Sequence, residues 1–173
     1  MTFSKHRFII YFLLGTLLCS TGCFSYGFTG SSIPEGVNTI YIPFFPDQSN
    51  SGLGDLSNRL NRALIDRFIN QSKLSLASEE DNADAALSGT IVRYQNTPFS
   101  VTGEDESDLN QVSITVRAEF RFTDSDEPEW SQSFQSSFRF DPNENPIEGE
   151  NVAADNALEN IAQNMFNQAT GSW

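Results

Sequence analysis

The sequence predicts an α+β fold, a two-layer sandwich in which two helices pack on one face of a mostly antiparallel sheet of four to five strands. Segments 111–122 and 129–140 alternate apolar and polar residues, which is typical of strands with one dry and one wet face. Segments 53–68 and 152–169 repeat apolar residues every three or four positions, which is typical of amphipathic helices. Because no repeat or linker divides residues 37–173, we expect a single domain there.

The first strand and helix follow from residue type and spacing. Residues 37–45 (VNTIYIPFF) are β-branched and aromatic, and Pro43, which lacks an N–H, marks an edge, a bulge or the strand's end. The first helix is predicted to span about four turns from Leu53 to Phe68. Its apolar stripe is Leu53, Leu56, Leu60, Leu64 and Phe68.

The remaining elements are predicted from the same periodicities. A short strand at 74–77 precedes an acidic turn, and a longer one at 85–95 contains Gly89, which permits a bulge or a close approach. Strands 111–122 and 129–140 form a hairpin. The second helix presents the stripe Leu158, Ile161, Ala162, Met165, Phe166 and Ala169.

The amino terminus has the pattern of a lipoprotein signal peptide. Lys5 and Arg7 precede an apolar run at 8–18, and small residues lead to Cys23. The run reaches about half of a ~30 Å hydrocarbon core, so a membrane-spanning anchor is disfavoured. We expect residues 1–22 to be removed, Cys23 to be acylated, and residues 23–36 to form a tether. The alternative is a free thiol after an ordinary secretory cleavage site.

Charge restricts the partners of the remaining chain. Residues 23–173 hold eight basic and 23 acidic side chains, a net charge of −15. This balance argues against a nucleic-acid partner, since phosphate binding needs a basic surface. It also argues against lying flat on anionic lipid. Phe24 and Ser25 after Cys23 lack the aspartate that favours the inner membrane, so we expect lipid to hold the protein at the outer membrane, facing the periplasm.

The residue inventory argues against catalysis. His6, the single histidine, leaves with the signal peptide, and Cys23 is expected to be acylated, so neither can complete a hydrolytic triad or a zinc site. We expect no catalytic residues, no metal and no cofactor. Carboxylates are abundant enough to leave a glycosidase-like acid and base pair open. They crowd into loop segments, however, which favours a solvated surface.

Two groups of residues are candidates for a binding surface. Arg117 and Arg121 lie on the wet side of one predicted strand, Arg139 lies on its neighbour, and Arg93 joins them if its strand pairs alongside. Guanidinium groups bind phosphate in a bidentate manner; alternatively, these arginines offset Glu119 and the acidic loops. Most of the 15 phenylalanines occupy inward positions. The exceptions near loops, candidates for a partner surface, are Phe28, Phe44, Phe45 and Phe99.

Several motifs, in order along nearly the whole exported chain, resemble one family. They are Phe28-Thr29-Gly30-Ser31-Ser32-Ile33-Pro34, Ile42-Pro43-Phe44-Phe45, Leu56-Leu60-Leu64 with Arg67-Phe68, Ser113-Ile114-Thr115-Val116, Phe166-Asn167-Gln168-Ala169 and Trp173. Their order and spacing are similar to those of the lipopolysaccharide-assembly lipoprotein LptE in its Bacteroidetes-type form. The segment 24–27 departs from that pattern, which affects the details of the tether.

The resemblance implies a non-enzymatic role. Such a protein sits as a plug in the LptD β-barrel of the outer membrane, helps that barrel assemble, and assists lipopolysaccharide toward the outer leaflet. LptD and lipopolysaccharide are therefore the expected partners. A second hypothesis is a periplasmic lipoprotein of the TolB/CsgG-like type that scaffolds or activates an envelope enzyme, because such modules share the early strand and helix pattern.

Replacing Cys23 with serine removes the thiol that accepts the lipid. We expect Cys23→Ser to accumulate as an unlipidated precursor or as a soluble periplasmic form, measured by acyl labelling and membrane sedimentation. Normal labelling and full sedimentation of the serine variant would contradict the lipidation site.

Overall fold

The structure, a computed structural model, describes residues 36–100 and 108–171. Contacts divide the chain into Met1–Gly30 and Ser31–Trp173, and every described residue belongs to the second unit. The signal peptide, Cys23, most of the tether and Phe28 lie outside the described residues. The sheet and both helices therefore belong to one unit.

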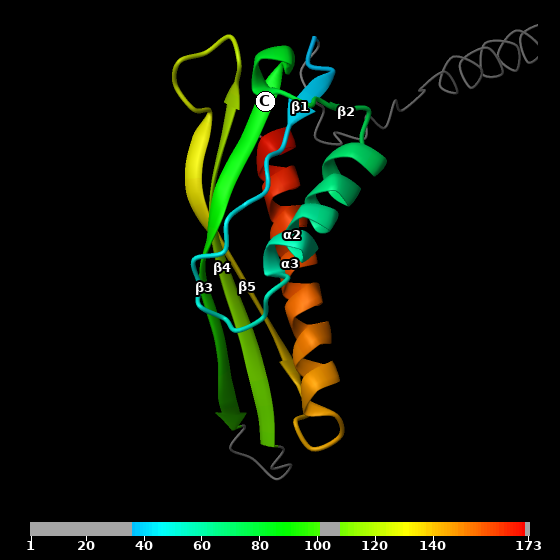
Figure 1. Ribbon diagram of the computed structural model, residues 1–173, viewed down its shortest axis with the longest axis vertical. Coiled ribbons are helices and arrows are strands. Elements are labelled where there is room, and N and C mark those ends of the chain that lie inside the picture. The colour runs from blue at the N-terminus through cyan, green and yellow to red at the C-terminus, as the bar shows by residue number, and fades with distance from the viewer. Residues whose placement is uncertain (1–35, 101–107, 172–173) are drawn as a thin grey trace, which may run out of the picture. The chain divides into compact units, whose positions relative to one another are not determined.

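The sheet has five strands in the order β2-β1-β3-β4-β5 (Figure 1). They are β1 (Thr39–Tyr41), β2 (Ser75–Leu76), β3 (Ala85–Ser100), β4 (Asp108–Phe122) and β5 (Trp130–Phe140). The long strands β3, β4 and β5 are antiparallel neighbours, whereas β1 runs parallel to both β2 and β3. A helical crossover separates β1 from β2, which allows the chain to re-enter the sheet in the same direction. The predicted α+β sandwich is confirmed.

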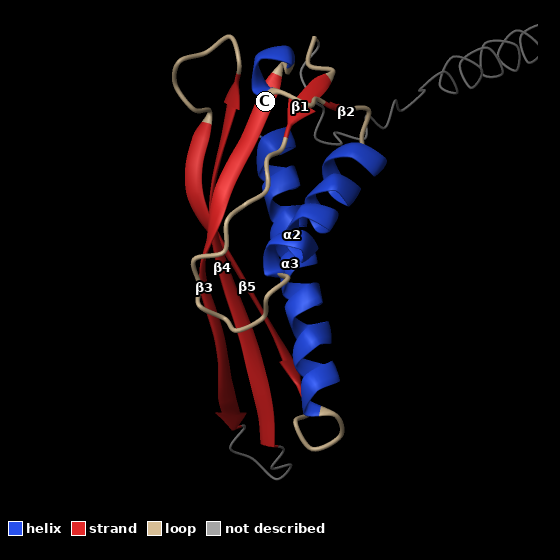
Figure 2. Ribbon diagram, in the orientation of Figure 1, coloured by secondary structure: helices blue, strands red, loops and turns tan. Residues whose placement is uncertain are grey.

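Both helices lie on one face of the sheet (Figure 2). α2 (Leu56–Ile65) continues into a π-helical turn, η2 (Asp66–Asn70), and α3 spans Pro146–Gly171. A short 3₁₀ turn, η3 (Glu80–Asn82), precedes β3. α2 begins three residues later than predicted. α3 begins six residues earlier, at Pro146, because proline is well suited to the first helical position, where no N–H is needed.

The core lies between the helices and the sheet. α2 and η2 bury Leu56, Leu60, Leu64 and Phe68. α3 buries five alanines, which let its backbone approach the sheet closely: Ala153, Ala154, Ala157, Ala162 and Ala169. Phe68 and Phe166 meet edge to face, with ring centroids 5.2 Å apart. These contacts join α2 to α3 and cover the apolar face of the sheet.

The chain after β1 runs along the edge of β3. The predicted strand 37–45 shortens to three residues because Pro43 and Pro46 cannot donate to a ladder. The Gln48 N–H donates to the Ile91 carbonyl at 2.9 Å, and the Ile91 N–H donates to the Pro46 carbonyl at 3.0 Å. A Cβ atom at Gly89 would collide with the ring of Phe45. Gly89 therefore serves a close approach, one of its two predicted roles.

The Asp84 side chain links the start of β3 to the start of β1 through hydrogen bonds. Its Oδ2 accepts hydrogen bonds from the backbone N–H groups of Asn38 and Thr39, at 2.8 and 2.9 Å, and from the Thr39 hydroxyl at 2.8 Å. The Asn38 N–H, followed by the Thr39 hydroxyl and N–H, lowers the pKa of Asp84 below its ordinary value of 3.8.

Asp84→Asn tests this link through pH. Since the folded-state pKa is lowered, the charged carboxylate stabilises the fold above about pH 4 and ceases to do so as pH falls through the folded value. We expect Asp84→Asn to lower the free energy of unfolding at pH 7, with a deficit that shrinks by pH 3, measured by urea denaturation. Asp126→Asn, at an exposed turn, is the control. A deficit that is equal at both pH values would contradict the charge effect.

Leu60→Ala tests the α2 interface. Leu60 is fully buried, and truncating such a residue costs about 2–5 kcal/mol because a cavity remains. We expect that loss in chemical denaturation, whereas Leu76→Ala, at a residue that is half exposed, should unfold like the parent protein. An unchanged midpoint for Leu60→Ala would mean that α2 does not pack on the sheet as described.

Candidate functional site: the outer face of the sheet

The face of β3, β4 and β5 that turns away from α2 and α3, termed the outer face, is polar. Alternation in β4 produces it, because the buried inward residues are Val112, Ile114, Val116, Ala118 and Phe120. The outward residues of β4 are Gln111, Ser113, Thr115, Arg117, Glu119 and Arg121. Serines and glutamines of β5 continue the outer face beside them. The predicted dry and wet faces of this hairpin are confirmed.

The outer face is locally positive although the chain is acidic. It holds four of the eight basic residues of segment 23–173, and Glu119 is the one acidic residue among its described outward positions. The helical layer on the opposite side of the sheet is mixed in charge. α3 carries four acidic residues and no basic ones, whereas α2 and η2 carry three arginines and one aspartate, which leaves that layer net negative. An anionic ligand would therefore meet less repulsion at the outer face than at the helical face.

A β-bulge decides which residues of β3 face outward. Ile91 pairs with Val116 and Arg93 pairs with Thr115, so Val92 is an extra residue between them. One inserted residue reverses the alternation that follows. Arg93 consequently joins the outer face, and Tyr94 turns inward, where its hydroxyl donates to Glu150 Oε1 at 2.6 Å. Burial, together with the Glu150 carboxylate, raises the pKa of Tyr94, so the phenol keeps the proton that it donates.

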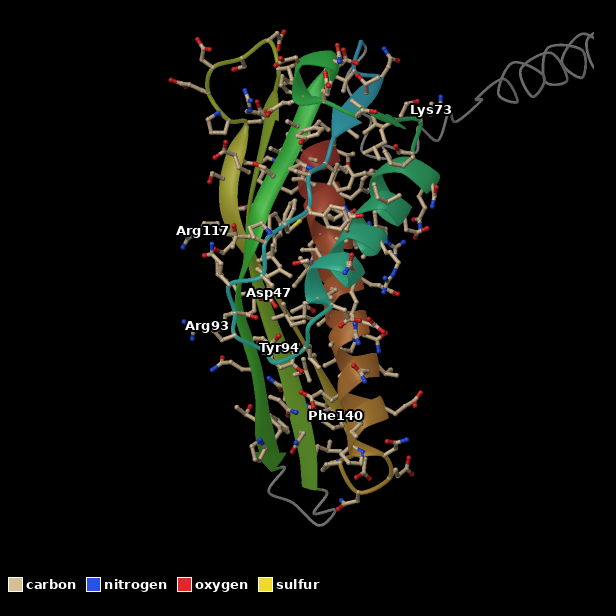
Figure 3. All side chains as sticks on the ribbon, in the orientation of Figure 1. Asp47, Lys73, Arg93, Tyr94, Arg117 and Phe140 are labelled. Carbon is tan, nitrogen blue, oxygen red and sulfur yellow. The ribbon has the colours of Figure 1, made fainter. Side chains whose placement is uncertain are left out.

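The bulge also brings two arginines near each other. Arg117 pairs with Thr90, and Arg93 lies on the next row across the bulge, opposite Thr115. Figure 3 shows both side chains projecting from the sheet on the side opposite the helices. Diagonal neighbours on adjacent strands lie about 7–8 Å apart, which is within reach of two oxygens of a phosphorylated ligand.

The other two candidate arginines lie apart from this pair and have partners. Arg121 forms an ion pair with Glu80. Arg139 lies over the Phe99 ring, with 3.7 Å between its guanidinium carbon and the ring centroid. Arg139 pairs with Gln111, six residues from Arg117 along β4, a separation of about 20 Å. The structure thus brings Arg93 and Arg117 together and leaves Arg121 and Arg139 toward opposite ends of the sheet.

A shallow groove of about 370 Å³ adjoins Arg117 on the outer face. Its polar lining comes from three strands and from the segment that runs along the edge of β3. These residues are Gln48, Ser88, Thr90, Arg117, Glu119 and Ser131. Gln48 was not predicted from the sequence, because the turn-rich segment 46–54 carries no periodicity that would place it beside β3. The groove offers hydroxyl, amide and guanidinium groups, which suit a phosphorylated or hydroxylated ligand.

The loop phenylalanines have different environments. The prediction that Phe45 belongs to a partner surface is wrong, because its side chain is 1% exposed and fills the space above Gly89. Phe44, its neighbour, is 63% exposed. The two side chains diverge because adjacent residues of an extended segment point in opposite directions. Phe99 lies under Arg139.

The described residues also bear on two other classes of site. Within residues 36–100 and 108–171, no three carboxylates, histidines or cysteines converge as a metal site would require. In the same part of the chain, no helix has the length and apolar character needed to cross a membrane.

Comparison with known families decides the identity of this architecture. The family model described as LptE, lipopolysaccharide-assembly, matches residues 37–169, which include every strand and most of α3. The chain belongs to the LptE family. The family resemblance predicted from the sequence motifs is thereby confirmed, and it places the protein among lipopolysaccharide-assembly lipoproteins of the cell envelope. No curated protein matches the chain.

Solved structures share the fold of this LptE-family chain at low identity. A protein of Xanthomonas campestris is 10% identical, with a TM-score of 0.58, over 79% of this chain and 85% of that one. The lipoprotein B of Nitrosomonas europaea is 12% identical, with a TM-score of 0.56, over 82% and 86%. A Chlamydia trachomatis protein is 10% identical, with a TM-score of 0.50, over 78% and 94%. At such identities the likeness concerns the fold.

Proposed function

We propose that this LptE-family chain is an outer-membrane lipoprotein, anchored by lipid on Cys23 and facing the periplasm, that plugs an LptD-type β-barrel and helps it assemble. In this role it has no catalytic activity and needs no cofactor. It contacts lipopolysaccharide through the outer face, where Arg93 and Arg117 bind phosphate. The observation that carries the proposal is this polar, locally positive sheet face on a family member whose net charge is otherwise strongly negative.

The polar outer face supports the role of a plug. The lumen of a large outer-membrane barrel is lined by polar side chains. A sheet that presents serine, threonine and glutamine side chains can form hydrogen bonds with such a wall. It also leaves no apolar surface exposed to the water in the lumen. The exposed positions of α3 are mostly polar, with Ile147 and Val152 as the large apolar exceptions, so most of the unit's surface suits a hydrophilic wall.

The paired arginines support contact with lipopolysaccharide. Charge-assisted hydrogen bonds contribute about 1.5–3 kcal/mol each, more than neutral ones. Because the chain as a whole repels phosphate, binding depends on a local basic group of this kind. Arg121 and Arg139 remain candidates for weaker contacts, although each already has a partner.

The test is purification of the tagged full chain from detergent, followed by a lipopolysaccharide-binding assay at low salt. We expect a β-barrel of the LptD type to co-purify in stoichiometric amount. Arg93→Glu with Arg117→Glu should weaken lipopolysaccharide binding by about tenfold or more and leave barrel recovery unchanged. The charge-matched control is Arg62→Glu with Arg67→Glu on the helical side, which should bind like the parent chain.

Each part of the proposal has its own contradicting result. Absence of a barrel from the purified material would favour the hypothesis of a periplasmic scaffold for an envelope enzyme. Equal weakening by both charge-reversal pairs would mean that net charge, rather than the Arg93 and Arg117 site, governs binding.

A further inference from the structure

The sheet has two long unpaired edges. In the described part of the chain, β5 pairs with β4 alone, and β3 beyond its bulge likewise has β4 as its one neighbour. An unpaired edge presents backbone N–H and C=O groups that any extended chain can bond. Natural proteins usually carry features that protect such edges from strand addition. The two edges of this sheet can be compared by whether they have these features.

The β3 edge is protected at several points. Segment Asp47–Gln48 covers it at Ile91, and the bulge at Val92 interrupts its regular pairing pattern directly afterwards. Arg93 adds a charge, and Pro98 lacks a backbone N–H. Bulges, charges, prolines and covering segments are the features that prevent another strand from adding to an edge.

The β5 edge has none of these features along most of its length. Its residues from Trp130 to Phe140 pair with β4 one for one, without a register shift, and include no proline, glycine or lysine. Arg139, at the far end, carries its one charge. The exposed positions before it are serines and glutamines: Ser131, Gln132, Ser133, Gln135 and Ser137. A regular edge of eleven residues whose one charge lies at its far end is suited to accept another strand.

α3, the helix that packs against β5, is uncharged over its C-terminal half. α3 has no charged side chain from Asn160 to Gly171. Asn156, Asn160, Asn164 and Asn167 are exposed and recur every three or four residues, so they share one side of α3. Asparagine is a poorer helix former than lysine or glutamate, so helix propensity does not explain its use here. Neutral amides cost less to desolvate than charges, which suits a surface that becomes covered.

We propose that the β5 edge receives an extended strand from the partner β-barrel protein, which adds a sixth strand to the sheet. This inference rests on the proposed function for the identity of the partner. Strand addition derives affinity from main-chain hydrogen bonds and specificity from alternate side chains. The incoming strand should place apolar residues beside Trp130 and Phe134 on the helical side, and polar, uncharged residues on the outer face.

A second copy of this chain fits the edge less well than an extended segment of the barrel protein outside its closed wall does. Two copies, each with a net charge of −15 after cleavage, repel one another. Antiparallel pairing of two β5 strands over their whole length would also place Glu129 of one copy opposite Asp141 of the other. Like charges directly opposite each other destabilise a strand pair.

The test compares amide hydrogen exchange in the full lipidated chain alone and in its co-purified barrel complex, both in detergent. Amides of β5 that point away from β4 should exchange at least about tenfold more slowly in the complex, whereas amides of residues 95–97 in β3 should change little. Ser133→Lys with Gln135→Lys should reduce barrel recovery by about tenfold, because charge on an edge opposes strand addition. The matched control, Gln95→Lys with Thr97→Lys, alters exposed positions at the protected edge and should not reduce recovery.

The outcomes separate this inference from the proposed function. A barrel that co-purifies with the parent chain, without slower exchange in β5 and without an effect of the Ser133 and Gln135 lysines, overturns strand addition and leaves the barrel partnership in place. Absence of the barrel overturns both. Slow exchange of β5 in the isolated chain, with a doubled mass in light scattering, assigns the edge to a second copy and also overturns the inference. Unchanged melting temperatures of the lysine variants establish that they remain folded.

Discussion

The β-bulge at Val92 is the constraint on which the two faces of the sheet depend. Without the extra residue, the alternation that buries Leu87 and Ile91 would carry Arg93 into the core and Tyr94 to the outer face. Hydrogen bonds fix β3 on either side of the bulge along the chain. The segment Pro46–Gln48 exchanges two backbone hydrogen bonds with Ile91 before it, and Tyr94 bonds Glu150 of α3 after it. One inserted residue thereby supplies both a basic pair outside and a polar link to α3 inside.

The net charges of the two layers differ, and the bulge contributes Arg93 to that difference. α3 carries four acidic side chains, and the acidic turns lie at η3 and between β4 and β5. The arginines of α2 and η2 offset part of this charge, whereas the outward residues of β3 and β4 carry three arginines and one glutamate. A chain with this net charge can approach an anionic glycolipid with its sheet face and still repel it elsewhere. Electrostatic repulsion of this kind favours one orientation of approach, which is useful for a protein that handles a phosphorylated lipid beside a membrane.

The helical layer provides the rigidity that such a surface requires. Arg59 of α2 donates to Asn151 Oδ1 at 2.7 Å and forms ion pairs with Asp55 at 2.9 Å and Asp155 at 3.3 Å. Alanines let α3 approach the sheet closely, and the Phe68 and Phe166 rings fill the space between the helices. The outer face therefore rests on a packed core, while the β5 edge stays available for pairing.

The sequence by itself determined the elements with strong periodicity. Alternation located β4 and β5, the stripe from Leu56 to Phe68 located α2, and the ordered motifs identified the family, since each pattern depends on neighbours along the chain. The observed ends of helices and strands differ from the predicted ends by several residues, as at the start of α3 at Pro146. The reason is that a local pattern specifies the end of an element less strongly than its interior.

Tertiary structure alone decided which way Arg93 points, that Phe45 is buried while Phe44 is exposed, and that Arg139 lies far from Arg117. It also decided that β1 is parallel to both of its neighbours. These features depend on strand register, on one bulge and on the segment that runs along the edge of β3. All three are set by contacts between residues far apart in the chain and leave no periodic signal in the sequence.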